Sequence, residues 1–133
     1  MKKVVISGSS KLQGKVDCWI KVFENNGCEV IDYPKAVDSI DYNQKVLTIY
    51  KEFFPNIENS DLFFLMNEDK DGIKGHVGPS AFAELTYAIM QNLLHGKKIE
   101  IYILNMPGKE ASLYEELTFW LEMGLIKLWE PQS

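Results

Sequence analysis

A helix opens at Gly78-Pro79-Ser80-Ala81-Phe82-Ala83-Glu84-Leu85-Thr86-Tyr87-Ala88, directly after a long polar loop. Proline suits the first helical position because its missing N–H would be unpaired there in any case. Apolar residues then recur at spacings of three and four, which predicts one face for a core: Phe82, Leu85, Ile89 and Leu93. Glu84 lies beside that face. Taken alone it is most simply a solvated helix carboxylate, but it can also face a cleft while the helix packs on a sheet.

Short hydrophobic blocks lie on both sides of this helix. Asp61–Met66 precedes it and Ile99–Leu104 follows it, and both are typical of strands covered on two faces. The helix is expected to end near Leu94, where Gly96 can adopt the left-handed conformation of a C-cap. A strand, a helix and a strand in this order form the unit of a parallel sheet.

The rest of the chain repeats the same alternation. We expect strands at Lys3–Ser7, Cys28–Tyr33 and Ile126–Trp129, and helices at Lys11–Asn26, Tyr42–Phe54 and Glu110–Met123. Pro55 should interrupt the second helix or lie in its frayed end. The pattern predicts a single α/β domain over residues 1–133. Its doubly wound, flavodoxin-like parallel sheet should have about five strands in the order 2-1-3-4-5, with helices on both faces.

Composition narrows the classes of function. With 133 residues, of which 46% are hydrophobic, the chain has enough apolar side chains for one real core. The net charge is −5 and no lysine or arginine block occurs, which disfavours a nucleic acid polymer as partner. No apolar run is long enough to span a membrane, and the one after Lys3 is too short for a signal peptide. The expected location is therefore the cytoplasm.

The cysteines and histidines show no pattern of a metal or redox centre. Cys18 and Cys28 form no C-x-x-C pair, so we expect buried, reduced thiols. His76 and His95 lack metal-ligand spacing. The sequence therefore predicts no metal ion and no cofactor.

The loop Asn67–Val77 is longer than most strand-to-helix connections, and long loops in compact domains are often functional. Its start, Asn67-Glu68-Asp69-Lys70-Asp71-Gly72, is similar to the first half of a calcium loop. Gly78 stands where such a loop needs a bidentate Glu, which argues against calcium. The loop is expected to be a solvated mobile lid, or a lid whose Asn67 or Glu68 touches a substrate.

Ligands of such a sheet bind at the carboxyl ends of the strands, between strands one and three. The loops there are Ser7–Lys11 and Asn67–Gly78, and the second leads to Glu84. Ser7-Gly8-Ser9-Ser10 combines a glycine, hydroxyl groups and a helix N-terminus, which suits a phosphate or a sugar. A tight turn with a serine cap explains it equally well. Neither G-x-G-x-x-G nor a Walker A motif occurs, so a dinucleotide or nucleoside triphosphate is not indicated.

Two other protein classes share this architecture. A receiver domain needs clustered acidic residues after the first strand, where this chain has Ser7-Gly8-Ser9. A flavodoxin needs aromatic side chains on loop tips beside the flavin, whereas Phe82 and Tyr87 lie on the predicted helix. Flavin binding stays a weak alternative.

Three segments resemble the nucleoside 2-deoxyribosyltransferases and the related 2′-deoxynucleoside 5′-phosphate N-hydrolases: Val5–Ser9, Ser60–Leu65 and Ala83–Ala88. The turn Gly96-Lys97-Lys98-Ile99 is also similar to the Gly-Lys turn of that family. The resemblance covers roughly residues 4 to 106. The chain departs from the family at Ser80 and Phe82, where glycines are usual, and at Gly78, where an acid is usual.

This resemblance implies an enzyme that cleaves the N-glycosidic bond of (deoxy)nucleosides or their monophosphates, by base transfer or by hydrolysis. Glu84 would be the nucleophile that attacks C1′. Other residues would contact the substrate: Ser7, Gly8, Ser9, Asp61, Asn67 and Ser80. Asp61 can also be a simple cap at the start of its strand. The family further implies a homodimer or a higher homo-oligomer.

A protein with the same fold and cleft but without catalysis is the alternative. Such a chain would bind or sense a nucleotide. Release of free base distinguishes the two, because a sensor binds saturably and releases none.

Overall fold

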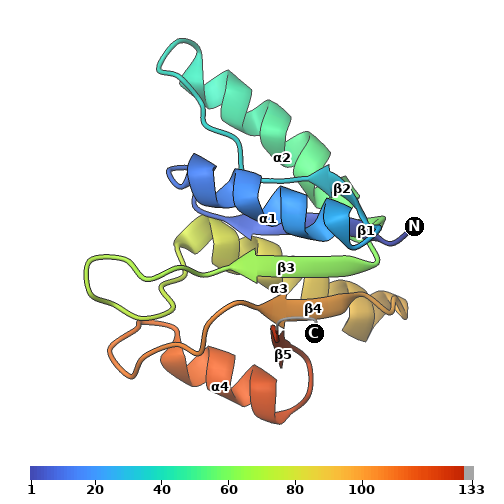
Figure 1. The fold of residues 1–133 in the computed structure, drawn as a ribbon, viewed down its shortest axis with the longest axis vertical. Coiled ribbons are helices and arrows are strands. Elements are labelled where there is room, and N and C mark those ends of the chain that lie inside the picture. The colour runs from blue at the N-terminus through green and yellow to red at the C-terminus, as the bar shows by residue number, and fades with distance from the viewer. Residues whose placement is uncertain (131–133) are drawn as a thin grey trace.

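The computed structural model describes residues 1–130. Residues 129–133 were expected to be a tail or part of an interface, and residues 131–133 of that segment lie outside the described residues. Five parallel strands form one sheet in the order β2-β1-β3-β4-β5 (Figure 1). Their bounds are β1 Lys3–Gly8, β2 Glu29–Asp32, β3 Leu62–Met66, β4 Glu100–Ile103 and β5 Lys127–Leu128. The predicted fold class and strand order are confirmed.

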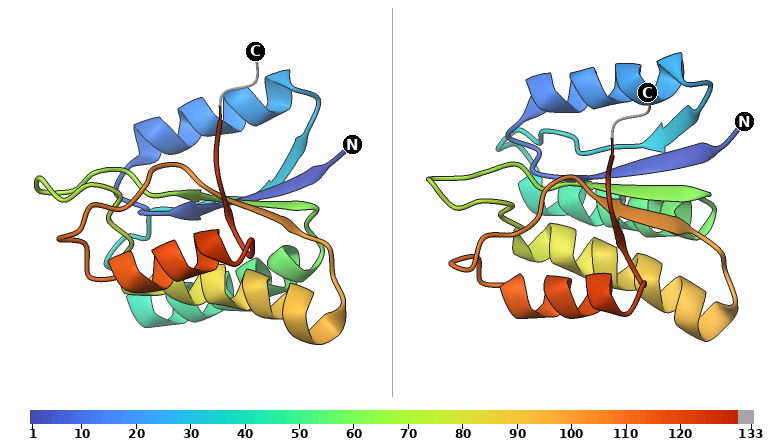
Figure 2. Two further views of the ribbon diagram at one scale, coloured as in Figure 1. Left: turned by 90° about the horizontal axis from the view of Figure 1, so that it is seen from below. Right: turned by 60° about the horizontal axis from the view of Figure 1, so that its bottom comes forward.

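In the part of the chain that the structure describes, the helices divide unequally between the two faces of the sheet. Figure 2 shows α1 (Gln13–Asn25) alone on one side, with α2 (Tyr42–Glu58), α3 (Pro79–His95) and α4 (Tyr114–Glu122) on the other. Successive side chains of a strand point to opposite faces of the sheet, so they pack against different helices. In β1, Val4 and Ile6 pack with α1, whereas Val5 packs with the three-helix layer. Both faces of the central strands are therefore covered, and β3 is buried throughout.

Aromatic side chains cover the part of the sheet that α1 leaves open. The ring of Trp129 lies 5.3–6.3 Å from four other rings, which with it form the aromatic cluster: Trp19, Phe23, Phe64 and Tyr102. Figure 2 shows the chain after α4 crossing the edge of the sheet to reach this face. The sequence alone left the role of Trp129 open, and the structure makes it part of a core.

Two helix boundaries differ from expectation. Helix α2 does not stop at Phe54 but continues through Pro55 to Glu58. A proline removes one N–H, and the burial of Phe53 and Ile57 on either side of it holds the last turn in place. Helix α4 begins at Tyr114 rather than near 110, because residues 108–114 form two successive backbone turns.

Two burial expectations were wrong. Leu93 is 54% exposed, although its spacing placed it in the core. The side chain of Asn92 exchanges two hydrogen bonds with the backbone of Ile99, just before β4, so the helix has already reached the end of the sheet there. Cys18 is exposed on α1 and Cys28 is half-buried, and neither forms a disulfide.

Across residues 1–130, none of the helices has both the length and the apolar character that a membrane crossing requires.

Candidate active site

Ser7 and Glu84 meet at the carboxyl ends of the central strands. The Ser7 hydroxyl donates a hydrogen bond of 2.6 Å to Oε1 of Glu84, although the two residues are 77 positions apart. Ser7 follows Val5 by two positions on β1, so both face the layer that contains α3. Pro79 starts α3 beside β1, which brings Glu84 within reach. The packing of α3 on β1 thus creates this pair.

The environment of Glu84 disfavours its charged form. Burial is the main cause, because it removes water from the carboxylate, and the negative charge of Asp32 adds to the effect. The hydrogen bond from Ser7 acts in the opposite direction. Together they raise the pKa of Glu84 from 4.5 to about 7. This carboxyl group is therefore close to half ionised at neutral pH, and such shifts are typical of functional sites.

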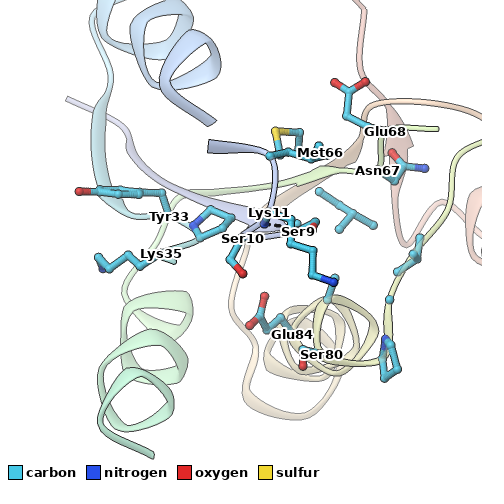
Figure 3. Close-up of a pocket in the computed structure, with 18 of the residues that line it drawn as sticks. Ser9, Ser10, Lys11, Tyr33, Lys35, Met66, Asn67, Glu68, Ser80 and Glu84 are labelled. Carbon is cyan, nitrogen blue, oxygen red and sulfur yellow. Dashed lines mark hydrogen bonds between the residues drawn. The ribbon is translucent and has the colours of Figure 1, made fainter. Parts of the chain in front are cut away.

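Glu84 lines a cleft of about 580 Å³, within the size range of small-molecule sites. Figure 3 shows Glu84 and Ser80 on α3, with Ser9, Ser10 and Lys11 above them. Tyr33 and Lys35 lie on one side, and Asn67 and Glu68 on the other. A further wall is apolar and comes from α2: Val46, Ile49, Tyr50 and Phe53. The cleft thus offers hydroxyl, charged and aromatic contacts around the carboxyl group of Glu84.

The residues Ser7, Gly8 and Ser9, at the end of β1 and directly after it, have different roles at the site. Ser7 is fully buried, so it supports Glu84 from below. At Gly8 a Cβ would lie 3.0 Å from the Met66 carbonyl oxygen, so glycine is needed there for β1 to pack against β3. Ser9 lies at the cleft, where its Oγ accepts a hydrogen bond from the Lys11 amide. Of the predicted contacts, Ser9 and Ser80 have exposed positions at the cleft.

Asn67 is at the cleft, but its side chain is used within the protein. Asn67 is 2% exposed. Its side-chain oxygen accepts a 3.0 Å hydrogen bond from the Asn105 backbone N–H, and its side-chain nitrogen donates a 2.8 Å hydrogen bond to the Asn105 carbonyl oxygen. The Asn105 side-chain amide donates a 3.0 Å hydrogen bond to the Asn67 carbonyl oxygen. The Asn67 side chain also donates a longer one to the Gly75 carbonyl oxygen. This reciprocal pair joins the ends of β3 and β4. Asn67 is therefore a brace, and its amide is not free for a substrate.

The rest of the 67–77 loop is also held by its own hydrogen bonds. Asp69 accepts from the Gly75 amide at 3.0 Å. Lys70 and Ile73 pair across a tight turn, whose central Asp71 and Gly72 have φ of 51° and 79°. Positive φ at both positions is the type I′ geometry that Asp-Gly favours. These contacts argue against the expected freely mobile lid.

We expect Asn67→Ala to lower the free energy of unfolding by about 2–3 kcal/mol, because it leaves polar groups of Asn105 without partners. Urea denaturation measures this. Asn26→Ala is the control, since Asn26 is exposed and its side chain bonds only its own helix. An unchanged stability together with weaker ligand binding would restore Asn67 as a substrate contact.

Asp61 does not belong to the cleft. It precedes β3 at the amino end of the sheet, where its Oδ2 accepts a 2.8 Å hydrogen bond from the Lys3 amide. The cleft lies at the opposite, carboxyl end. The expectation that Asp61 contacts a substrate is therefore corrected in favour of a cap that joins β1 and β3.

Phe82 does not narrow the cleft. Its ring stacks on Trp120 of α4, with centroids 5.5 Å apart and an interplanar angle of 6°. This bulky residue, at a position where the deoxyribosyltransferases that the sequence resembles have glycine, thus serves the contact between α3 and α4. Ser80, the other departure, lines the cleft.

Several residues of the cleft were missed in the sequence. Tyr33 and Lys35 follow the end of β2 and start the connection to α2. Their place after a strand, at the edge where all carboxyl ends gather, was a usable signal. The wall on α2 had no such signal, because Val46 and Tyr50 fit the spacing of a core-facing stripe.

Within the described part of the chain, no three His, Cys, Asp or Glu side chains are grouped so that they could hold a metal ion.

No family model and no curated protein matches the sequence. A solved structure, the CMP N-glycosidase BcmB of Clostridium botulinum, has a similar fold, with a TM-score of 0.53. The match covers 96% of this chain and 86% of that one, at 21% sequence identity. At this identity the likeness shows a shared fold.

Proposed function

We propose that this protein cleaves the N-glycosidic bond of a nucleoside or nucleoside monophosphate, with Glu84 as the nucleophile. The observation that carries the proposal is the partly buried hydrogen bond from Ser7 to Glu84, which lines the cleft. The shared fold of a CMP N-glycosidase and the resemblance of three segments to deoxyribosyltransferases support the same reaction class.

The proposed chemistry uses two displacements at C1′. One oxygen of Glu84 forms a bond to C1′ while the bond from C1′ to the nucleobase breaks, and the base leaves with the electron pair and takes up a proton. Water, or a second base, then attacks C1′ and releases the carboxylate, with net retention. A carboxylate in a water-poor site stabilises the positive charge that develops on the sugar.

The pH dependence follows from the state of Glu84. A nucleophile must be ionised, and the pKa of Glu84 is raised to about 7. We therefore expect kcat/KM to rise about tenfold per pH unit below pH 7 and to level off above it. Initial rates of base release from pH 5 to 9 measure this. A rate that falls across pH 7 would instead indicate that Glu84 acts in its protonated form.

The direct test is incubation with cytidine, deoxycytidine, CMP and dCMP, followed by chromatography of the free base. A second nucleobase in the mixture separates transfer from hydrolysis, because a transferase forms the exchanged nucleoside. Saturable nucleotide binding without base release from any substrate would favour the sensor.

We further propose that two copies associate beside the cleft. Tyr42, Leu47 and Tyr50 of α2 are between 42% and 54% exposed, and Tyr42 and Tyr50 also line the cleft. Light scattering after size-exclusion chromatography tests this. A monomer at micromolar concentration, with full activity, would contradict it.

A further inference from the structure

A buried carboxylate that the proposed chemistry does not use lies at the end of β2. Asp32 is 2% exposed, and three groups donate hydrogen bonds to it. The Tyr33 amide and Lys35 Nζ reach Oδ1 at 2.8 and 2.6 Å, and Asn56 Nδ2 reaches Oδ2 at 2.9 Å. The donors come from the strand end, the following connection and α2. One side chain thus joins three segments that border the cleft.

The register of the sheet places this carboxylate close to the site. Asp32 pairs with Val5 on β1, and Ser7 lies two residues further along the same strand. Two residues of a strand span about 7 Å. Tyr33 and Lys35 follow Asp32 in the chain and form one side of the cleft in Figure 3. Lys35 Nζ lies 4.8 Å from the centroid of the Tyr33 ring.

We propose that Asp32 is a positioning residue of the Glu84 site: its fixed, buried charge contributes to the field in which Glu84 ionises, and its hydrogen bonds hold the wall formed by Tyr33 and Lys35. This inference rests on the proposed function, because it gives Asp32 a role in the same reaction. It adds a second carboxylate that acts through Glu84 and not on the substrate.

Lys35 does not cancel this field. Its side chain is 42% exposed, whereas that of Asp32 is 3% exposed. Water screens the ammonium group, while the carboxylate acts through the protein interior, where charges interact more strongly. The negative charge of Asp32 accordingly contributes to the raised pKa of Glu84.

Other charged or titratable groups line the remaining walls of the cleft that contains Glu84: Lys11, Glu68, Asp69, Lys70 and His76. Lys11, Asp69 and Lys70 are exposed, so solvent screens them. Glu68 and His76 are half-buried, so solvent screens their charges less. The test must therefore read the Glu84 carboxyl group itself.

The experiment follows the side-chain carboxyl carbons by ¹³C NMR from pH 4 to 9, with Glu84→Gln identifying the signal. In Asp32→Asn we expect the Glu84 titration to move down by about half a pH unit, less than the roughly one to three units of directly contacting charges. At pH values below the pKa of Glu84, that shift corresponds to about threefold faster base release by the variant than by the wild type at the same pH. Ser7→Ala should raise the pKa of Glu84, because the hydrogen bond from Ser7 favours the ionised form of Glu84.

Asp38→Asn is the matched control. Asp38 lies on the same connection and pairs with Lys45, but its side chain is 67% exposed. We expect it to leave the Glu84 titration unchanged. If Asp32→Asn unfolds too readily, Asp32→Ser should give the same downward shift.

A purely structural role for Asp32 predicts lower stability without a downward shift of Glu84. No shift, or an upward one, in the folded variants would overturn the proposal. The titration needs no turnover, so it can fail or succeed separately from base release, which tests the proposed function.

Discussion

Glu84→Gln is expected to reduce kcat/KM for base release by about a thousandfold or more. The amide has nearly the same shape and can still accept the Ser7 hydrogen bond through its oxygen. It cannot bond covalently to C1′ at a useful rate, and it carries no charge to stabilise the developing cation. Chromatography of free base in single-turnover reactions measures the loss.

Glu52→Gln is the control, because Glu52 is an exposed carboxylate on α2 that does not line the cleft. It should keep the wild-type rate. Mass spectrometry of rapidly acid-quenched wild-type reactions should show a pentosyl group on the peptide that contains Glu84. Full-rate release by Glu84→Gln would remove Glu84 from the mechanism.

The same variant is expected to be more stable than the wild type at alkaline pH. Glu84 has a pKa of about 7 in the folded protein, against 4.5 for a glutamate in the unfolded chain. Its contribution to stability is therefore complete below pH 4.5 and is lost as the pH rises through 7. The difference corresponds to roughly 3 kcal/mol at pH 8. Urea denaturation at pH 4.5 and pH 8 measures the gain, which should appear only at the higher pH.

Trp129→Ala is expected to lower the free energy of unfolding by about 3 kcal/mol, near the lower end of large aromatic truncations because the ring is only partly buried. Trp129 contacts four rings of the aromatic cluster and covers the side of β3 and β4 that α1 does not reach. Removal leaves Phe64 and Tyr102 facing a cavity or solvent. Thermal and urea denaturation measure the effect.

Phe119→Ala is the comparison for this prediction. Phe119 is also aromatic and near the end of the described chain, but it is 55% exposed on α4. Its truncation should cost at most about 0.5 kcal/mol. Equal losses in both variants would mean that the aromatic cluster contributes no more than surface residues do.

The burial of side chains was predicted only in part, which shows the limits of local sequence patterns. The spacing of Phe82, Leu85 and Ile89 correctly predicted a helix that packs on the sheet. It could not show that the sheet ends before Leu93, nor that Phe82 meets Trp120. The spacing of apolar residues indicates which of them share one face of a helix. How far the sheet under that face extends depends on segments elsewhere in the chain.

The roles of the polar residues were also predicted only in part. Asn67 and Asp61 were both reasonable substrate contacts by position along the chain. Asn67 proved to be satisfied by Asn105, and Asp61 by the Lys3 amide at the far end of the sheet. A polar side chain at a strand end needs a partner, and sequence does not say whether the protein or a ligand supplies it.

The sequence by itself determined the alternating order of strands and helices, the parallel sheet and the end of that sheet at which Glu84 lies. These follow from short-range periodicity and from the handedness of the crossovers. Only the tertiary structure decided that Glu84 bonds Ser7, that Asp32 is buried nearby, and that Trp129 stands where a further helix could cover the sheet. Such contacts join residues far apart in the chain, and they depend on how whole elements pack, which no local pattern encodes.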